Sequence, residues 1–124
     1  MTLYSYRDMI VWQKSMDLVV LVYQLVKSLP KEETFALASQ MRRSVVSIPS
    51  NIAEGKSRKS LKEFTNFLSI ARGSVSELET QLYICEKVNY LPYEKIVPAL
   101  ELSDEIGRML SSLISKFANR YPNL

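Results

Sequence analysis

Histidine is absent from this 124-residue sequence, and cysteine occurs once, at Cys85. Zinc and haem sites built on clusters of cysteine and histidine are therefore excluded, and no disulfide can form within the chain. Histidine is also the commonest general acid or base near neutral pH. We expect a protein without cofactors that is not an enzyme, although chemistry based on carboxylates stays open.

Long apolar runs are missing as well. The longest unbroken run covers residues 18–23, whereas a helix that crosses a membrane needs about 20 apolar residues. The first residues, MTLYSYRDM, lack the basic-then-apolar order of a secretory signal. We expect a cytoplasmic protein with no membrane contact.

Only three glycines occur, and 47% of the residues are hydrophobic, which is typical of a globular helical chain. The length suits one domain with a single core. The apolar spacing predicts an all-α fold over residues 1–124. We expect an up-down-up-down antiparallel four-helix bundle with helices at about 8–29, 31–55, 60–89 and 93–118.

Breaks and apolar spacing give the second and fourth helices their expected limits. Gly55 is expected to close the second helix in the left-handed conformation, and Pro98 is a candidate for the true first-turn residue of the fourth. The predicted core positions of the second helix are Phe35, Ala38, Met41, Val45, Ile48 and Ile52. Those of the fourth are Leu102, Ile106, Met109, Leu113 and Phe117.

The third helix has the clearest pattern. Ser60 and Glu63 fit a capping box, in which the two residues satisfy each other's free backbone donors. Apolar residues then recur in alternating steps of three and four, which favours near-antiparallel packing. These residues are Leu61, Phe64, Leu68, Ala71, Val75, Leu78, Leu82 and Cys85.

Pro49 interrupts the second helix within the stretch SVVSIPSNIAEG. A proline inside a helix loses one hydrogen bond and costs about 3 kcal/mol, yet the apolar phase continues past it. We therefore predict a kinked but continuous helix, with Ser47, Ser50 or water bonding the freed carbonyl of Val45. A polar stripe beside the apolar one holds either a hydrogen-bond network between helices or a groove open to solvent; it comprises Arg43, Ser47, Asn51, Glu54 and Arg58.

The first helix is apolar on every side between Val19 and Val22, more than one face of a bundle requires. Either neighbouring helices shield this segment in part, or it packs against another subunit.

Two other motifs give little evidence of function. Gly55-Lys56-Ser57 lacks the first glycine and the preceding strand of a phosphate-binding loop, and we interpret Cys85 as a core residue.

Positive charge is concentrated in one quarter of the chain. The net charge is +3, but residues 42–72 hold seven basic side chains against Glu54 and Glu63 only. These seven are Arg42, Arg43, Lys56, Arg58, Lys59, Lys62 and Arg72. They form either a solvated surface or a patch that contacts the phosphates of nucleic acid.

Four segments resemble a known bacterial family: residues 6–16, 39–43, 47–55 and 67–79. It is the four-helix-bundle family encoded in intervening sequences of 23S ribosomal RNA genes, and the resemblance extends over about residues 6–117. The most specific segment is IPSNIAEG. The resemblance implies a homo-oligomer, typically a pentamer, and a relationship to the accessory variability protein of diversity-generating retroelements, which binds nucleic acid and a reverse transcriptase.

Together these features lead to one main hypothesis and one alternative. The main hypothesis is a non-enzymatic homo-oligomer that binds structured RNA or DNA through the seven basic residues, as an accessory to an RNA-processing or reverse-transcribing partner. The alternative is a protein-interaction scaffold that does not bind nucleic acid and whose basic residues only aid solubility.

Overall fold

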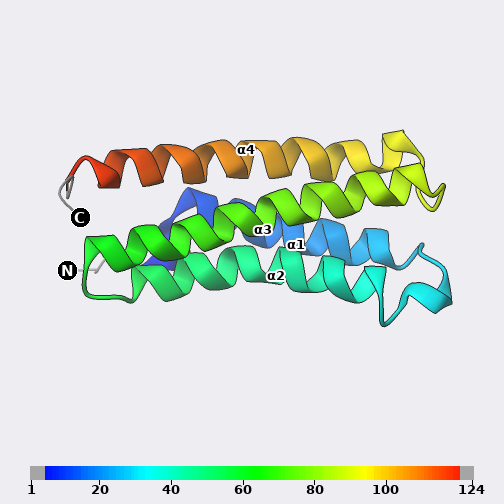
Figure 1. Ribbon diagram of the computed structural model, residues 1–124, viewed down its shortest axis with the longest axis horizontal. Coiled ribbons are helices and arrows are strands. Elements are labelled where there is room, and N and C mark those ends of the chain that lie inside the picture. Colours follow the sequence, from blue (N-terminus) through cyan, green and yellow to red (C-terminus); the bar gives the residue numbers. More distant parts are fainter. Residues whose placement is uncertain (1–4, 121–124) are drawn as a thin grey trace.

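Four α-helices make up most of the chain in the computed structural model, which describes residues 5–120 (Figure 1). They are α1 (Ile10–Val26), α2 (Leu37–Lys56), α3 (Leu61–Lys87) and α4 (Tyr93–Ala118), preceded or joined by the short 3-10 helices η1 (Tyr6–Asp8) and η2 (Lys31–Glu33). No strand occurs among the described residues. The predicted all-α fold with four helices is confirmed.

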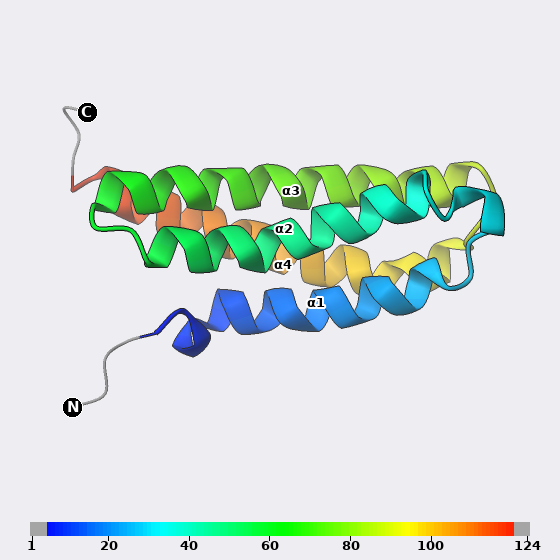
Figure 2. The same ribbon diagram turned by 90° about the horizontal axis from the view of Figure 1, so that it is seen from below.

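The helices lie side by side along their lengths, and their connections alternate between the two ends of the molecule (Figures 1 and 2). The most extensive packing joins α2 to α3, followed by α3 to α4, whereas α1 makes fewer contacts with α2 and α4. Within residues 5–120, none of the helices combines the length and apolar character needed to cross a membrane.

The core follows the predicted pattern closely in α3. Every position of its apolar seam from Phe64 to Cys85 is buried, and Leu61 is half-buried. Ser60 caps the helix by accepting a hydrogen bond from the Glu63 backbone N–H at 3.1 Å, and its hydroxyl donates to the Glu63 carboxylate at the same distance. The predicted box is thus present in part, with the carboxylate bonded to the hydroxyl.

In α4 the buried stripe lies slightly to one side of the predicted one. Ile106 is buried as expected, but the other predicted positions are only half-buried, at the edge of the core. The fully buried positions include the small residues Ala99 and Ser103. Small side chains let α4 approach the bundle closely, and a search for large apolar residues alone overlooks them.

The start of α2 differs from the prediction. The expected single helix from residue 31 is broken into η2 and α2, and α2 begins only at Leu37. Phe35, predicted as a core residue, lies between them and is 95% exposed. The reason is a local anchor: the Glu33 carboxylate accepts hydrogen bonds from the Leu37 backbone N–H at 3.2 Å and the Tyr90 hydroxyl at 2.6 Å.

Pro49 lies inside α2, as predicted, and is buried. The helix continues through it, while the kink itself stays a prediction.

Pro98 lies inside α4, so its expected place in the first turn was wrong. Pro92 occupies the N-cap instead. The first turn is completed by a bond from the Lys95 backbone N–H to the Pro92 carbonyl at 2.9 Å.

Gly55 does not end α2 in the left-handed conformation, because no glycine among the described residues has a positive φ. It is buried inside the helix, and a Cβ atom added there would lie 2.7 Å from Phe67 Cβ and 3.0 Å from Phe64 Cδ1. Its role is therefore close contact between α2 and α3. Within residues 5–120, the residue in the left-handed conformation is Asn89, with φ 65°, just after α3.

Cys85 is fully buried, with its thiol 3.6 Å from the sulfur of Met41. Burial raises the pKa of this thiol to about 11, and the nearby charge of Glu33 adds to the effect. The thiolate, which is the reactive form, is therefore scarce at neutral pH. The interpretation of Cys85 as a core residue is confirmed.

We expect Gly55→Ala to destabilise the protein by about 1–2 kcal/mol, since crowding against α3 outweighs the better helix propensity of alanine. Gly73→Ala is the matched control, because Gly73 lies in α3 and nothing would lie within 4 Å of its added Cβ. That change should stabilise the protein by about 0.5–1 kcal/mol. Urea denaturation measures both, and equal effects of the two substitutions would contradict the close-contact role.

The hydrogen bonds to Glu33 lower the pKa of its carboxyl from the ordinary 4.5, with the Tyr90 hydroxyl as the main cause. A lowered pKa means that the anchor stabilises the fold above about pH 4.5 and loses this effect as the pH falls through the folded-state pKa. In Tyr90→Phe, the Glu33 pKa measured by carboxyl NMR titration should rise toward 4.5. Tyr83→Phe, at an exposed tyrosine of α3, should leave it unchanged. An unaltered Glu33 pKa in Tyr90→Phe would refute the anchor.

Candidate nucleic-acid interface

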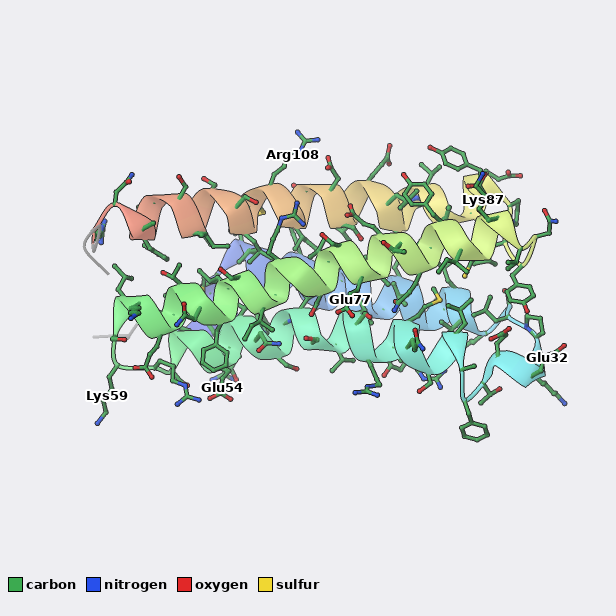
Figure 3. All side chains as sticks on the ribbon, viewed as in Figure 1. Glu32, Glu54, Lys59, Glu77, Lys87 and Arg108 are labelled. Atoms are coloured by element: carbon green, nitrogen blue, oxygen red, sulfur yellow. The ribbon has the colours of Figure 1, made fainter. Side chains whose placement is uncertain are left out.

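The ends of all four helices on one side of the bundle bring together residues far apart in the sequence. The start of α1, the end of α2, the start of α3 and the end of α4 lie at the same end of the molecule (Figures 1 and 2). An aromatic contact joins two of them directly, because the rings of Phe64 and Phe117 are 5.4 Å apart. Lys59 projects from this end (Figure 3).

This end carries an excess of positive charge, and we call it the basic end. Its acidic residues are Asp8, Glu54 and Glu63. Its basic residues are Arg7, Lys56, Arg58, Lys59, Lys62, Lys116 and Arg120. The opposite end is closer to balance, with five basic residues, Lys27, Lys31, Arg42, Lys87 and Lys95, against four glutamates, Glu32, Glu33, Glu86 and Glu94. The charge of the molecule is therefore polarised along the bundle axis.

Arg58 is held in place within the turn that joins α2 to α3. Its guanidinium is 2.9 Å from the Glu54 carboxylate and lies 4.9 Å from the ring centroid of Phe67. The Ser57 hydroxyl donates to the Glu54 carbonyl at 2.7 Å and secures the start of the same turn. The ion pair is exposed and contributes little stability, but together these contacts orient the turn that carries Lys59.

Four of the seven predicted site residues meet at the basic end, namely Lys56, Arg58, Lys59 and Lys62. Arg42 and Arg43 do not join them, because they lie about 20 Å back along α2. Arg42 donates to the Thr34 carbonyl at 3.0 Å, beside the start of α2. Arg43 is exposed at a groove between α2 and α3.

Arg72 lies between α3 and α4. Its Nε donates to the Ser111 hydroxyl at 3.1 Å and its Nη1 to the Ser76 hydroxyl at 3.2 Å. A Cβ atom added at Gly107 would lie 3.2 Å from the Arg72 guanidinium carbon, so the glycine leaves room for it. These contacts show a packing role, and a contact of Arg72 with nucleic acid stays a prediction.

Sequence reasoning missed Arg7, Lys116 and Arg120, because they lie outside the basic quarter of the chain. The signal that finds them is topological. In an antiparallel bundle the start of the first helix and the end of the fourth lie beside the turn between the second and third. Arg120 packs over Phe117 at 6.0 Å from the ring centroid, which places it next to the start of α3 through the Phe64–Phe117 contact.

The predicted polar stripe of α2 makes hydrogen bonds between helices. The hydroxyls of Ser47 and Ser74 are 2.8 Å apart, and the Asn51 amide donates to both the carbonyl and the hydroxyl of Ser47, each at 2.8 Å. The stripe also borders a groove at Arg43 and Ser47. Both of the alternatives for this stripe are therefore present, in adjacent parts of it.

Two acidic residues of α4 are exposed and paired with basic side chains. Asp104 binds Arg108 one turn away, and Glu105 is 3.0 Å from Lys14 of α1. Among the residues that the structure describes, no group of three or more histidine, cysteine, aspartate or glutamate side chains could hold a metal ion.

Comparisons with known proteins agree with the resemblance found in the sequence. The model of the 23S rRNA-intervening sequence protein family matches residues 7–112. A solved structure from Bacteroides thetaiotaomicron, a protein of unknown function from the S23 ribosomal protein family, is 32% identical. It superposes with a TM-score of 0.79 over 85% of this chain and 98% of its own. No curated protein matches the chain. The match over most of its length shows that the chain belongs to the 23S rRNA-intervening sequence protein family.

Proposed function

We propose that this protein is a non-enzymatic homo-oligomer that binds structured RNA or DNA through its basic end. The observation that carries the proposal is the polarised charge, with seven basic against three acidic side chains where the four helices end. Lysine and arginine that neutralise phosphates release counterions, which favours binding to nucleic acid of any sequence. The helix ends hold these side chains on a rigid frame.

The shape of the basic end favours a structured nucleic acid over a single strand. Proteins that bind single strands present aromatic side chains on which bases stack. Here the aromatic rings Phe64 and Phe117 pack on each other, and Phe67 is covered by Arg58. The cationic side chains thus offer contacts to phosphates. We propose the backbone of a duplex or folded RNA as the ligand.

Self-association is the second part of the proposal, and the exposed face of α1 supports it. Met16, Val20 and Tyr23 are spaced as one stripe along the helix and are 40%, 60% and 40% exposed. An apolar stripe of this kind suits burial against a second copy. The alternating connections support the up-down-up-down order of each subunit, and the family resemblance favours a pentamer. A ring would repeat the basic end and raise the avidity for a long polyanion.

The accessory role follows from the same two surfaces. An oligomer with a cationic face can hold nucleic acid beside a second protein, such as an RNA-processing enzyme or a reverse transcriptase.

The scaffold alternative is favoured by one specific observation, the 95% exposed side chain of Phe35 at the end opposite the basic end. Exposed aromatic side chains are frequent anchors in protein interfaces. A scaffold would bind its partner there and would not bind nucleic acid.

Charge reversal tests the nucleic-acid proposal. The variant Lys59→Glu, Lys62→Glu, Lys116→Glu should weaken binding to a ribosomal RNA hairpin or a DNA duplex at least about tenfold in fluorescence anisotropy. The slope of log affinity against log salt should fall by about one for each lysine that contacts a phosphate. The matched control is Lys27→Glu, Lys31→Glu, Lys87→Glu at the opposite end. It has the same net charge as the first variant and should bind the nucleic acid more tightly than that variant does. Equal loss in both variants would contradict a localised site.

Sedimentation tests the self-association. The wild-type protein at micromolar concentration should sediment above the monomer mass, and Val20→Asp should shift it toward the monomer, because a charge would enter an apolar interface. Asn66→Asp, at an exposed position of α3, serves as the control for a change of charge. A monomeric wild-type protein would overturn this part of the proposal without affecting the test of the basic end.

A further inference from the structure

A groove with a mostly apolar lining runs between the start of α1 and the second half of α4. It contains a hollow of about 450 Å³, a volume within the range of ligand sites, about 300–1,000 Å³. Ile10 in its wall is 54% exposed. The rest of the lining comprises Met9, Val11, Arg108, Met109, Ser112 and Leu113. Apolar surface left open in a groove marks a site of contact with another molecule.

The groove continues along α4 into an acidic hollow. This second hollow, of about 430 Å³, shares Arg108 and Met109 with the first and is otherwise lined by Glu101, Asp104 and Glu105. These three carboxylates lie within five residues of sequence, with no basic side chain between them, in a protein whose net charge is +3. The groove therefore has an apolar half near the basic end and an acidic half farther along the bundle.

Basic side chains neutralise the acidic half only in part. Arg108 forms an ion pair within α4, and Lys14 of α1 lies 3.0 Å from Glu105. Both pairs are open to solvent, contribute little stability and are easily exchanged for new partners. Glu101 and Asp17, which lies one turn after Lys14, form no ion pair within residues 5–120. Four carboxylates thus face two basic side chains, and the acidic half is net negative.

We propose that this groove binds a basic amphipathic helix of a partner protein. In helix-in-groove recognition, apolar side chains at spacings of three and four residues enter an apolar channel. Here they would contact Ile10 and Leu113, and the lysine or arginine side chains of the next turns would meet Glu101 and Glu105. The stretch of α4 from Leu113 to Glu101 is about 18 Å long, which matches about three turns of a docked helix.

The place of the groove connects it with nucleic-acid binding. Its apolar half adjoins the basic end, since Lys116 follows Leu113 by one turn of α4. A helix seated in the groove would hold its protein next to nucleic acid bound at the basic end. This consequence rests on the proposed function, whereas the groove itself requires no nucleic acid. A basic partner suits such an arrangement, because proteins that act on nucleic acid carry clustered positive charge.

Other occupants fit the groove less well. The phosphates of nucleic acid would be repelled by Glu101 and Glu105, and a purely apolar ligand would leave the acidic half without contacts. A second copy of this chain presents most of its basic residues on the separate ends of four helices, not along one helix face. A basic helix with one apolar face matches both halves of the groove.

The test uses the full-length protein without nucleic acid and a panel of synthetic peptides of about 14 residues, or four helical turns. Each peptide has leucine at helical spacing on one face and lysine elsewhere. We expect at least one to bind in fluorescence anisotropy, more weakly as salt rises. The same peptide with glutamate for every lysine should bind at least about tenfold more weakly. The proposal fails if no basic peptide binds or if charge reversal has no effect, and neither result bears on the basic end.

Two matched pairs of variants locate the site. Ile10→Lys should weaken peptide binding about tenfold, because an apolar contact is lost and lysine repels the peptide. Ile70→Lys, at a 52% exposed isoleucine of α3, should not. Glu101→Lys should weaken binding about threefold to fivefold, and Glu77→Lys, at an exposed position of α3, should have a smaller effect.

Equal effects within either pair would overturn the proposal. A lower sedimentation mass of Ile10→Lys than of the wild type, measured without peptide, would overturn it as well. The groove would then be a contact between copies of this chain.

Discussion

At Gly55 the backbone of α2 lies so close to α3 that an added methyl group would be 2.7 Å from Phe67 Cβ. The rest of the structure depends on this approach. It brings the turn between α2 and α3 against the bundle, where Arg58 covers Phe67 and Lys59 projects outward. Further along the same pair of helices, Ser47 meets Ser74 at 2.8 Å, and small side chains beside them leave the polar groove. The close packing of α2 on α3 thus supports the basic end and borders the polar groove between them.

Periodicity made the helices predictable, because a buried face must repeat at 3.6 residues wherever a helix packs. The seam of α3 follows this rule from Phe64 to Cys85. Apolar spacing alone failed at Phe35. The spacing gave no information about the hydrogen bonds of Glu33, one of them with Tyr90, that delay the start of α2. The predicted helix end at Gly55 was wrong for a related reason. Whether a glycine provides a turn or a close contact depends on the neighbouring helix.

The candidate site was only partly predictable. The turn residues Lys56, Arg58, Lys59 and Lys62 are close in sequence, so their clustering could be expected. Arg42 and Arg43 are close in sequence to that cluster but separated from it by the length of a helix. Lys116 and Arg120 are remote in sequence but belong to the basic end, because folding returns α4 to it.

The central claim is that the basic end touches nucleic acid. Ultraviolet cross-linking of the wild-type protein to a structured ribosomal RNA fragment, followed by mass spectrometry of the cross-linked peptides, tests it most directly. The account predicts cross-links in peptides that contain residues 56–62 or 116–120. Cross-links confined to the opposite end, around residues 27–36 and 86–95, would contradict it, as would the complete absence of cross-links under conditions of saturating RNA.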